Sequence, residues 1–303
     1  MHRPTLRQIE YFVVLSECSA FREAAARLHV TQPTLSGQIA DLEDRLGTRL
    51  FERGRFGVRL SADGVALLPR ARQLLIDLSD FCSAAKSMPN IFAGTIRIGV
   101  PTSLGPYLLP RLVPELHRRW PKMKLYVRED VPAALEQELM EGRYDLLLNS
   151  LDGDSHRFEI ESLFHEPLLI GLARDHPLAL KETLYAADLK GSAILALGPS
   201  HRFHDQVERL CRRLKAHLLT DYEGTSLDTL RQMVGMGMGL SFFPHFYVQS
   251  EMLGDPAIIV RQITDMPISR EIGLLWRKNA PGAEAYRMLG GLILKLSGLN
   301  PTQ

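Results

Sequence analysis

The sequence lacks several features that would place it in common classes of protein. It has only three cysteines among 303 residues, Cys18, Cys82 and Cys211, and they form no Cys-x-x-Cys pair. This pattern supports neither a disulfide framework nor a cysteine-rich zinc site. No apolar run approaches the roughly 20 residues that a membrane-spanning helix needs. The first residues also lack the uninterrupted apolar segment of a secretory signal. We therefore expect a cytoplasmic protein without a membrane partner.

Catalytic motifs are also missing. The sequence contains no Walker motif, no Gly-x-Ser-x-Gly and no His-Glu-x-x-His. The run from Gly235 to Gly239 is similar to a phosphate loop, but it follows a predicted helix and precedes a strand, whereas a dinucleotide motif needs the reverse order. His201 and His204 could share a helix face, but no further metal ligands can be assigned. We expect no enzymatic activity, no cofactor and no metal.

Charge and composition are close to average. The net charge is +1, from 36 basic and 35 acidic residues, and hydrophobic residues make up 45% of the chain. A wholly basic nucleic-acid coat is excluded, but DNA binding through a local basic patch is not, because the distribution of charge decides it. A chain of this length is expected to form two or three folding units.

The first 60 residues predict helices followed by a β-hairpin. Ser19 can cap a second helix. Thr31 begins a third helix with Pro33 in its first turn, where proline is tolerated, and Gly47 ends it. Residues 49–60 then form two short strands around glycines. This arrangement is typical of a winged helical domain.

A longer helix is predicted from Ser61, with a wide apolar face. One interpretation is that this face pairs with its copy in a second subunit, and the other is that it packs against its own chain. Residues 88–94 break the helix and form a hinge. The face consists of Leu67, Leu68, Ala71, Leu74, Leu75, Leu78, Phe81, Cys82 and Ala85.

From Thr95 onward, strand and helix patterns alternate, which predicts a mostly parallel sheet with helices on both faces. Two such rounds in about 200 residues suggest two similar lobes. The last strand and helix, 272–276 and 283–296, are expected to return to the first lobe. The predicted domains are 1–60 for the winged helical domain, 61–90 for the linker helix and hinge, and 91–303 for the two-lobed domain, with lobe I at about 95–164 and 270–303 and lobe II at about 165–269.

The strongest signal is the segment Phe21 to Ala40, FREAAARLHVTQPTLSGQIA, which predicts a helix-turn-helix. In such motifs the N-terminal end of the second helix enters the major groove of double-stranded DNA. Polar side chains there can contact base edges, and nearby arginines can neutralise phosphates. The predicted DNA-binding residues are Arg22, Thr31, Gln32, Pro33, Thr34, Ser36, Gln38, Arg53 and Arg55.

This segment resembles the LysR-type transcription regulators, and the likeness covers nearly the whole chain. The resemblance implies an all-α winged helix-turn-helix domain, a dimerising linker helix and an α/β two-lobed periplasmic-binding-protein-like effector domain. It also implies a homodimer or homotetramer on a palindromic operator, with RNA polymerase as a further candidate partner. The runs that carry it are Leu6-Arg-Gln-Ile-Glu-Tyr-Phe12, Ala24-Ala-Ala-Arg-Leu28, Thr31-Gln-Pro-Thr-Leu-Ser36, Leu42-Glu43, Leu46-Gly47 and Leu50-Phe51-Glu52-Arg53.

Within this family, several patches resemble the peroxide-sensing OxyR branch. That branch uses a His-Cys pair and a second cysteine nine residues after the first. Here Arg202 follows His201 directly, and Cys211 stands nine residues further on. An arginine cannot act as the reactive thiolate. The patches are Thr34–Ile39, Gly105–Pro110, Thr225–Arg231, Met233-Val234 and His201 with Asp205-Gln206.

A small anionic effector is predicted between the lobes. The segment Gly198–Asp205 begins a helix after a strand, and helix N-termini favour anions. Arg202 adds a guanidinium whose geometry matches a carboxylate. The alternative is that Arg202 is merely exposed and that the hydroxyl residues only cap helices. The predicted effector-binding residues are Thr102, Ser103, His201, Arg202, Asp205 and Thr225.

Other functions stay open at this point. A redox-responsive regulator could act through Cys211 alone, although its place among Val207, Leu210 and Leu214 is typical of a buried, inert thiol. A solute-binding module without DNA function would have the same two lobes. The helix-turn-helix and its basic hairpin count against that module and against an enzyme.

Overall fold

The structure is a computed structural model in which the chain divides into two compact units, Met1–Pro89 and Asn90–Gln303. The part that it describes contains no helix long and apolar enough to cross a membrane. Most of the predicted hinge at 88–94 lies outside this part, and so does Arg55. The described residues are 3–54, 57–86, 94–151 and 156–301.

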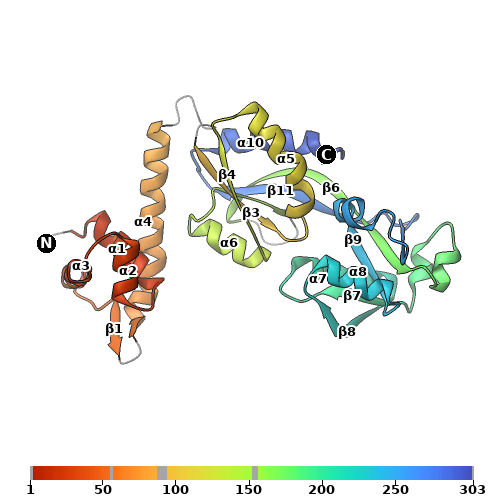
Figure 1. Ribbon diagram of the computed structural model, residues 1–303, viewed down its shortest axis with the longest axis horizontal. Helices are drawn as coiled ribbons and strands as arrows, with labels where there is room; N and C mark the ends of the chain where they lie inside the picture. Colours follow the sequence, from red (N-terminus) through yellow and green to blue (C-terminus); the bar gives the residue numbers. More distant parts are fainter. Residues whose placement is uncertain (1–2, 55–56, 87–93, 152–155, 302–303) are drawn as a thin grey trace. The chain divides into compact units, whose positions relative to one another are not determined.

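The N-terminal unit contains a helix-turn-helix packed on the helix that precedes it (Figure 1). Phe12 and Leu15 of the first helix share one buried core with Leu35 and Ile39 of the third. Burial of each such side chain contributes about 1.5–3 kcal/mol, which holds the third helix by its inner face and leaves its outer face to solvent. The helices are α1 (Leu6–Ser16), α2 (Phe21–Arg27) and α3 (Gln32–Leu46).

The ends of α3 follow the sequence signals. The Thr31 hydroxyl accepts a hydrogen bond from the backbone N–H of Thr34 at 3.3 Å, so Thr31 is the N-cap. Gly47 takes the left-handed conformation (φ 69°) that ends the helix. At the start of α2 the prediction was wrong, because the N-cap residue is Ala20. Ser19 instead receives its contacts from Glu23, whose carboxylate accepts bonds from the Ser19 backbone N–H and hydroxyl.

A β-hairpin and a long helix complete this unit. The buried carboxylate of Glu43 on α3 accepts hydrogen bonds from the backbone N–H groups of Leu50 (2.7 Å) and Phe51 (3.1 Å), which fixes the start of the hairpin against α3. The N-terminal unit is therefore helical apart from this hairpin. Its elements are β1 (Phe51–Gly54), β2 (Gly57–Leu60) and α4 (Ala62–Lys86).

The second unit contains two lobes that each have their own hydrophobic core. In lobe I, the strand β3 pairs in parallel with β4 and β5, and helices cover the sheet (Figure 1). Ile98, Leu148 and Trp276 lie in the core of this lobe. Its elements are β3 (Thr95–Pro101), α5 (Gly105–Arg119), β4 (Lys124–Asp130), α6 (Pro132–Met140), β5 (Leu146–Ser150), β11 (Ser269–Arg277) and α10 (Ala283–Ser297).

Lobe II repeats this plan with β7 at its centre, in parallel with β8 and β9. Leu195, Val207 and Leu230 are buried where α7 and α8 pack on the sheet. The sequence pattern missed β8 and β10. Its elements are β7 (Ala193–Leu197), α7 (Arg202–Leu214), β8 (His217–Gly224), α8 (Leu227–Gly235), β9 (Leu240–Pro244), α9 (His245–Tyr247) and β10 (Ile258–Arg261), with short helical turns at Pro177–Leu180, Ala186–Leu189 and Val248–Met252.

One long strand, β6 (Phe158–Ala173), belongs to both lobes. From Phe158 to Pro167 it pairs with β11, and from Leu168 onward it pairs with β9 and β10. All of these pairings are antiparallel, so the sheet is mixed and not mostly parallel as the sequence pattern predicted. Because β11 also pairs with β5, the chain returns to lobe I, where α10 packs on β6 and β11. The two lobes are thus joined by main-chain hydrogen bonds along β6.

Candidate functional site

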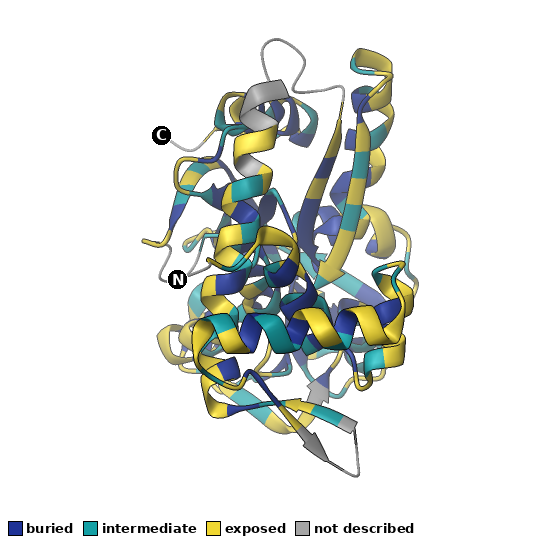
Figure 2. Cartoon of the chain, turned by 90° about the vertical axis from the view of Figure 1, so that its left-hand side faces the viewer, coloured by how far each residue is buried: buried dark blue, intermediate teal, exposed yellow. Residues whose placement is uncertain are grey.

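The N-terminal end of α3 is exposed to solvent and carries polar residues. Figure 2 shows the chain coloured by burial, with exposed residues in yellow. Thr31, Gln32, Pro33, Thr34 and Gln38 are exposed. Among the described residues, neither the Gln32 nor the Gln38 amide has a side-chain partner, so both are free to contact a base edge. The donors and acceptors of these two amides are therefore available to a ligand.

The other predicted DNA-binding residues have different surroundings. Ser36 is half-buried and already engaged in an interaction. Arg22 is exposed on α2, the helix that precedes the turn. Arg53 belongs to β1, and Arg55 lies outside the described residues. The structure therefore places Arg22 on the first helix of the helix-turn-helix and Arg53 in the hairpin that Glu43 fixes to α3.

The apolar face of α4 divides along the helix. Ala71 is buried and Leu67 and Leu68 pack against the core of the N-terminal unit, as one of the two interpretations predicted. Further along, Leu74 is 49% exposed and Phe81 72% exposed. The second interpretation, a partner subunit, therefore concerns only the later part of this helix.

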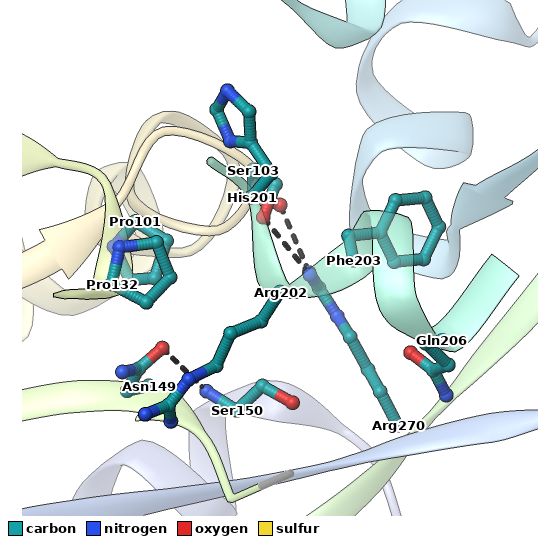
Figure 3. Close-up of a pocket in the computed structure, with 10 residues that line it drawn as sticks. All are labelled: Pro101, Ser103, Pro132, Asn149, Ser150, His201, Arg202, Phe203, Gln206 and Arg270. Carbon is teal, nitrogen blue, oxygen red and sulfur yellow. Dashed lines mark hydrogen bonds between the residues drawn. The ribbon is translucent and has the colours of Figure 1, made fainter. Parts of the chain in front are cut away.

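A small pocket lies where α7 of lobe II meets β5 and α6 of lobe I (Figure 3). Its volume is about 20 Å³, enough for a molecule the size of one water. Three of the predicted effector-binding residues line it: Ser103, His201 and Arg202. The complete lining is Pro101, Ser103, Pro132, Asn149, Ser150, His201, Arg202, Phe203, Gln206 and Arg270.

Arg202 spans the two lobes. Its Nη2 lies 2.6 Å from Oε1 of Glu136 on α6, and the Glu136 side chain is only 7% exposed. Burial raises the pKa of the Glu136 carboxyl more than the attraction of Arg202 lowers it. Arg202 is therefore not merely an exposed side chain, because a carboxylate of this chain already occupies one side of its guanidinium.

Two donors in this pocket have no partner among the described residues. They are Nη1 of Arg202 and Nδ2 of Asn149, and both atoms are buried. The Asn149 oxygen accepts from the backbone N–H of Ser150 at 2.8 Å, which fixes the amide with its nitrogen free. A buried donor without an acceptor costs roughly 1–3 kcal/mol. The pocket therefore favours a guest that supplies oxygen acceptors.

The sequence reasoning missed the most deeply buried charges of the site. Arg270 on β11 is 3% exposed and Glu166 on β6 is fully buried, with Nη2 of Arg270 lying 2.7 Å from Oε2 of Glu166. Arg270 also donates from Nη1 and Nη2 to the hydroxyl and carbonyl oxygens of Ser103, both at 2.9 Å (Figure 3). These bonds tie the loop after β3 to the strands that join the lobes.

Of the remaining predicted residues, Thr102, Asp205 and Thr225 are exposed and lie outside the lining of this pocket. Thr102 directly precedes Ser103, whose side chain points inward, and Asp205 lies in the first turn of α7. Thr225 precedes Ser226, whose hydroxyl caps α8. The N-cap of α8 is thus Ser226 and not Thr225. Position next to the end of a strand or the start of a helix did not predict which side chains line the pocket.

The cysteines and histidines show no reactive or metal-binding arrangement in the described part of the chain. Cys211 is 3% exposed, and burial raises the pKa of its thiol to about 11. Burial also lowers the pKa of His201, which favours its neutral form. No cluster of His, Cys, Asp or Glu side chains in the described residues could hold a metal ion. The thiol of Cys211 is therefore not activated in this state.

Comparison with known proteins places both units in one family. Residues 6–65 match the bacterial regulatory helix-turn-helix protein of the lysR family, and residues 90–295 match the LysR substrate binding domain. The chain is 36% identical to the DNA-binding transcriptional dual regulator OxyR of Escherichia coli K12, over 95% of this chain and 94% of that protein. It is 31% identical to the HTH-type transcriptional regulator EstR of Acinetobacter baylyi, over 97% of both chains.

Solved structures support the same family assignment. A full-length OxyR variant from Pseudomonas aeruginosa superposes with a TM-score of 0.82 at 32% identity, covering 100% of this chain and 99% of that one. The oxidised form of OxyR superposes with a TM-score of 0.63 at 32% identity, covering 69% of this chain and 98% of that one. The chain therefore belongs to the LysR family of DNA-binding transcription regulators and combines its helix-turn-helix domain with its effector-binding domain.

Proposed function

We propose that this regulator reads promoter DNA with the N-terminal end of α3, as part of a winged helix-turn-helix domain at residues 1–60. The observation that carries the proposal is that Gln32 and Gln38 are exposed at this end and have no side-chain partner among the described residues. Arg22, Arg53 and Arg55 would contact phosphates, which positions the helix without reading sequence.

A gel-shift assay with the DNA upstream of the protein's own gene tests this proposal. The full-length protein should bind that DNA more tightly than a scrambled duplex of equal length. Its affinity for both should fall as salt rises, because binding releases the ions condensed on the phosphates. Equal affinity for the two duplexes at every salt concentration would contradict sequence-specific reading.

We propose further that a small anion acts as the effector at the pocket of Figure 3, between the lobes of a periplasmic-binding-protein-like domain. The buried free donors of Arg202 and Asn149 carry this proposal, since both call for an oxygen acceptor. The pocket of about 20 Å³ is too small for a carboxylate or phosphate metabolite as it stands. Binding of such an anion would therefore require the pocket to widen. Release of Arg202 from Glu136 on the other lobe would widen it and would change the relation between the lobes.

Calorimetric titration of the full-length protein with succinate and with inorganic phosphate tests the effector site. The matched variant carries both Arg202→Gln and Glu136→Gln, so that neither charge is left buried without its partner. Loss of a charge-assisted hydrogen bond should weaken binding by about tenfold or more. Equal binding by the variant and the native protein would end the anion proposal.

A second candidate ligand is a neutral molecule the size of hydrogen peroxide. The pocket volume favours it, and several relatives are named hydrogen peroxide-inducible genes activators. Such a ligand would bind through the same donors without thiol chemistry, because Arg202 is no nucleophile and Cys211 is buried with a raised pKa. A peroxide-dependent change in DNA binding that is lost in Cys211→Ser would instead show the redox alternative.

The oligomer and its further partner are also proposals. The exposed apolar residues Leu74 and Phe81 on α4 would meet their copies in a second subunit, with residues 61–90 as the dimerising segment. The family resemblance adds a tetramer and contact with RNA polymerase. Phe81→Glu should shift the native dimer or tetramer to smaller species in analytical ultracentrifugation.

A further inference from the structure

A second pocket lies on α7, apart from the Arg202–Glu136 ion pair, where this helix packs beside the start of β11. Its volume is about 340 Å³, within the range of roughly 300–1,000 Å³ that is usual for small-molecule sites. It is thus much larger than the pocket of Figure 3. It is lined by Gln206, Arg209, Leu210, Arg213, Pro267, Ile268 and Ser269.

Two arginines give this pocket an uncompensated positive charge. Arg209 and Arg213 are four residues apart on α7, so their side chains leave the same face of the helix. Among the described residues, no carboxylate lies within 4.0 Å of either guanidinium, and no carboxylate lines the pocket. Arg212, between them in sequence, is paired with Glu208 at 2.6 Å. Among the described residues, Arg212 beside the pocket has a carboxylate partner, whereas Arg209 and Arg213 in its lining have none.

The remaining lining combines polar and apolar residues. Pro267 is exposed and offers an apolar surface, whereas Leu210 and Ile268 are only 4% and 8% exposed and add a small apolar area. A simple inorganic ion would leave Pro267 uncovered. A guest with one apolar ring or chain and a charged head group would cover the apolar residues and place its oxygens between the two guanidiniums.

We propose that this pocket binds an organic anion with an apolar body and a doubly charged oxyanion head, phosphate being the head group that two adjacent guanidiniums match best. The site goes beyond the function proposed above, since it shares neither Arg202 nor Asn149 with the first pocket. The two pockets do share Gln206, whose amide donates to the carbonyl oxygen of Ser269 at 2.9 Å. A test must therefore separate binding at one pocket from binding at the other.

Phenyl phosphate is a suitable probe for calorimetric titration of the full-length protein, with inorganic phosphate and phenol as its separate halves. The native protein should bind phenyl phosphate more tightly than either half. In the double variant Arg209→Gln, Arg213→Gln, affinity for phenyl phosphate should fall by about a hundredfold, roughly tenfold for each charge-assisted contact. The matched variant Arg212→Gln should bind as the native protein does, because this arginine is outside the lining.

Three outcomes would overturn the proposal. One is unchanged binding by Arg209→Gln, Arg213→Gln. Another is an equal loss in Arg212→Gln, which would show a general charge effect. The last is loss of phenyl phosphate binding in Arg202→Gln, Glu136→Gln, which would place the probe in the first pocket. Since Arg209, Arg212 and Arg213 are exposed, we expect all of these glutamine variants of α7 to fold, and their thermal unfolding should match that of the native protein.

Discussion

The end of α3 that we propose reads DNA and the pocket between the lobes differ in how their polar groups are paired. On α3 the amides of Gln32 and Gln38 are exposed, and neither has a side-chain partner in the described residues. In the pocket, Arg202 and Arg270 are already paired with Glu136 and Glu166. A duplex can therefore bind α3 without displacing any internal contact of these amides, whereas a ligand in the pocket meets arginines that carboxylates of the protein already hold on one side.

This difference suits the two tasks. A reading surface needs a fixed shape, which its buried core and caps supply. A sensor needs contacts that differ between its bound and free states, because a ligand shifts an equilibrium only by its differential affinity for the two states. The Arg202–Glu136 ion pair, which joins α7 of lobe II to α6 of lobe I, is a contact of that kind. Replacing single residues in each region tests this difference.

The largest effect is expected at Arg270. Arg270→Leu leaves the fully buried carboxylate of Glu166 without its partner, and breaking such a pair costs roughly 3–5 kcal/mol of unfolding free energy. Urea unfolding of the full-length protein measures this loss. Arg212→Leu, which breaks an exposed pair with Glu208, should cost no more than about 0–1 kcal/mol. Similar unfolding midpoints for the two variants would contradict the buried role of Arg270.

Gln32 should show the reverse behaviour, a large effect on DNA and none on stability. Gln32→Ala should reduce discrimination between the operator and a scrambled duplex by about 1–3 kcal/mol, the usual contribution of a bidentate base contact. Quantitative gel shifts at fixed salt measure it. Gln73→Ala makes the same change on the exposed face of α4 and should leave discrimination intact. A loss of stability in Gln32→Ala would show that this side chain supports the fold.

A smaller effect is expected from the cap of α3. Thr31→Ala removes the acceptor of the Thr34 backbone N–H and should cost about 1 kcal/mol of stability. Thr31→Ser retains the hydroxyl and should restore most of the loss. Thermal unfolding of both variants measures the cap. Gel shifts with the same variants measure a contact between the Thr31 methyl group and a base, which Thr31→Ser would not restore.

The smallest effect concerns the pH dependence of Glu136. Folding raises the pKa of this carboxyl, chiefly through burial, so the folded state holds its proton more tightly than the unfolded state. Glu136 therefore favours folding most below the ordinary pKa of glutamate, and this contribution is lost as pH rises through the raised pKa. Glu136→Gln should flatten that part of the profile of urea midpoint against pH. An unchanged slope in the variant would show that the carboxyl titrates normally.

Local signals predicted the second helix of the helix-turn-helix well because they act over a few residues. Thr31 and Gly47 define both ends of α3 through contacts and backbone angles close in sequence. Leu35 and Ile39 recur at helical spacing, which fixes the buried face and leaves Gln32 and Gln38 outside. Ser19 misled the prediction of the second N-cap, because a side chain four residues later, Glu23, competes for it.

The pocket could be predicted only in part. Arg202 and Ser103 follow predicted strands, which placed them near the carboxyl ends of the sheet. Glu136, Glu166 and Arg270 come from three separate elements, and no short-range pattern relates them. Glu166 lies in the middle of β6, where a charged residue is unexpected until Arg270 is known to face it.

By itself the sequence determined the helix-turn-helix, the alternation of strands and helices and the absence of a reactive cysteine after His201, because periodicity, capping and residue chemistry are local properties. The tertiary structure alone decided that Arg202 faces Glu136, that β6 carries both lobes, and that Arg209 and Arg213 line a second pocket without a carboxylate partner among the described residues. Those facts depend on which distant elements meet, and packing of the whole unit settles that question.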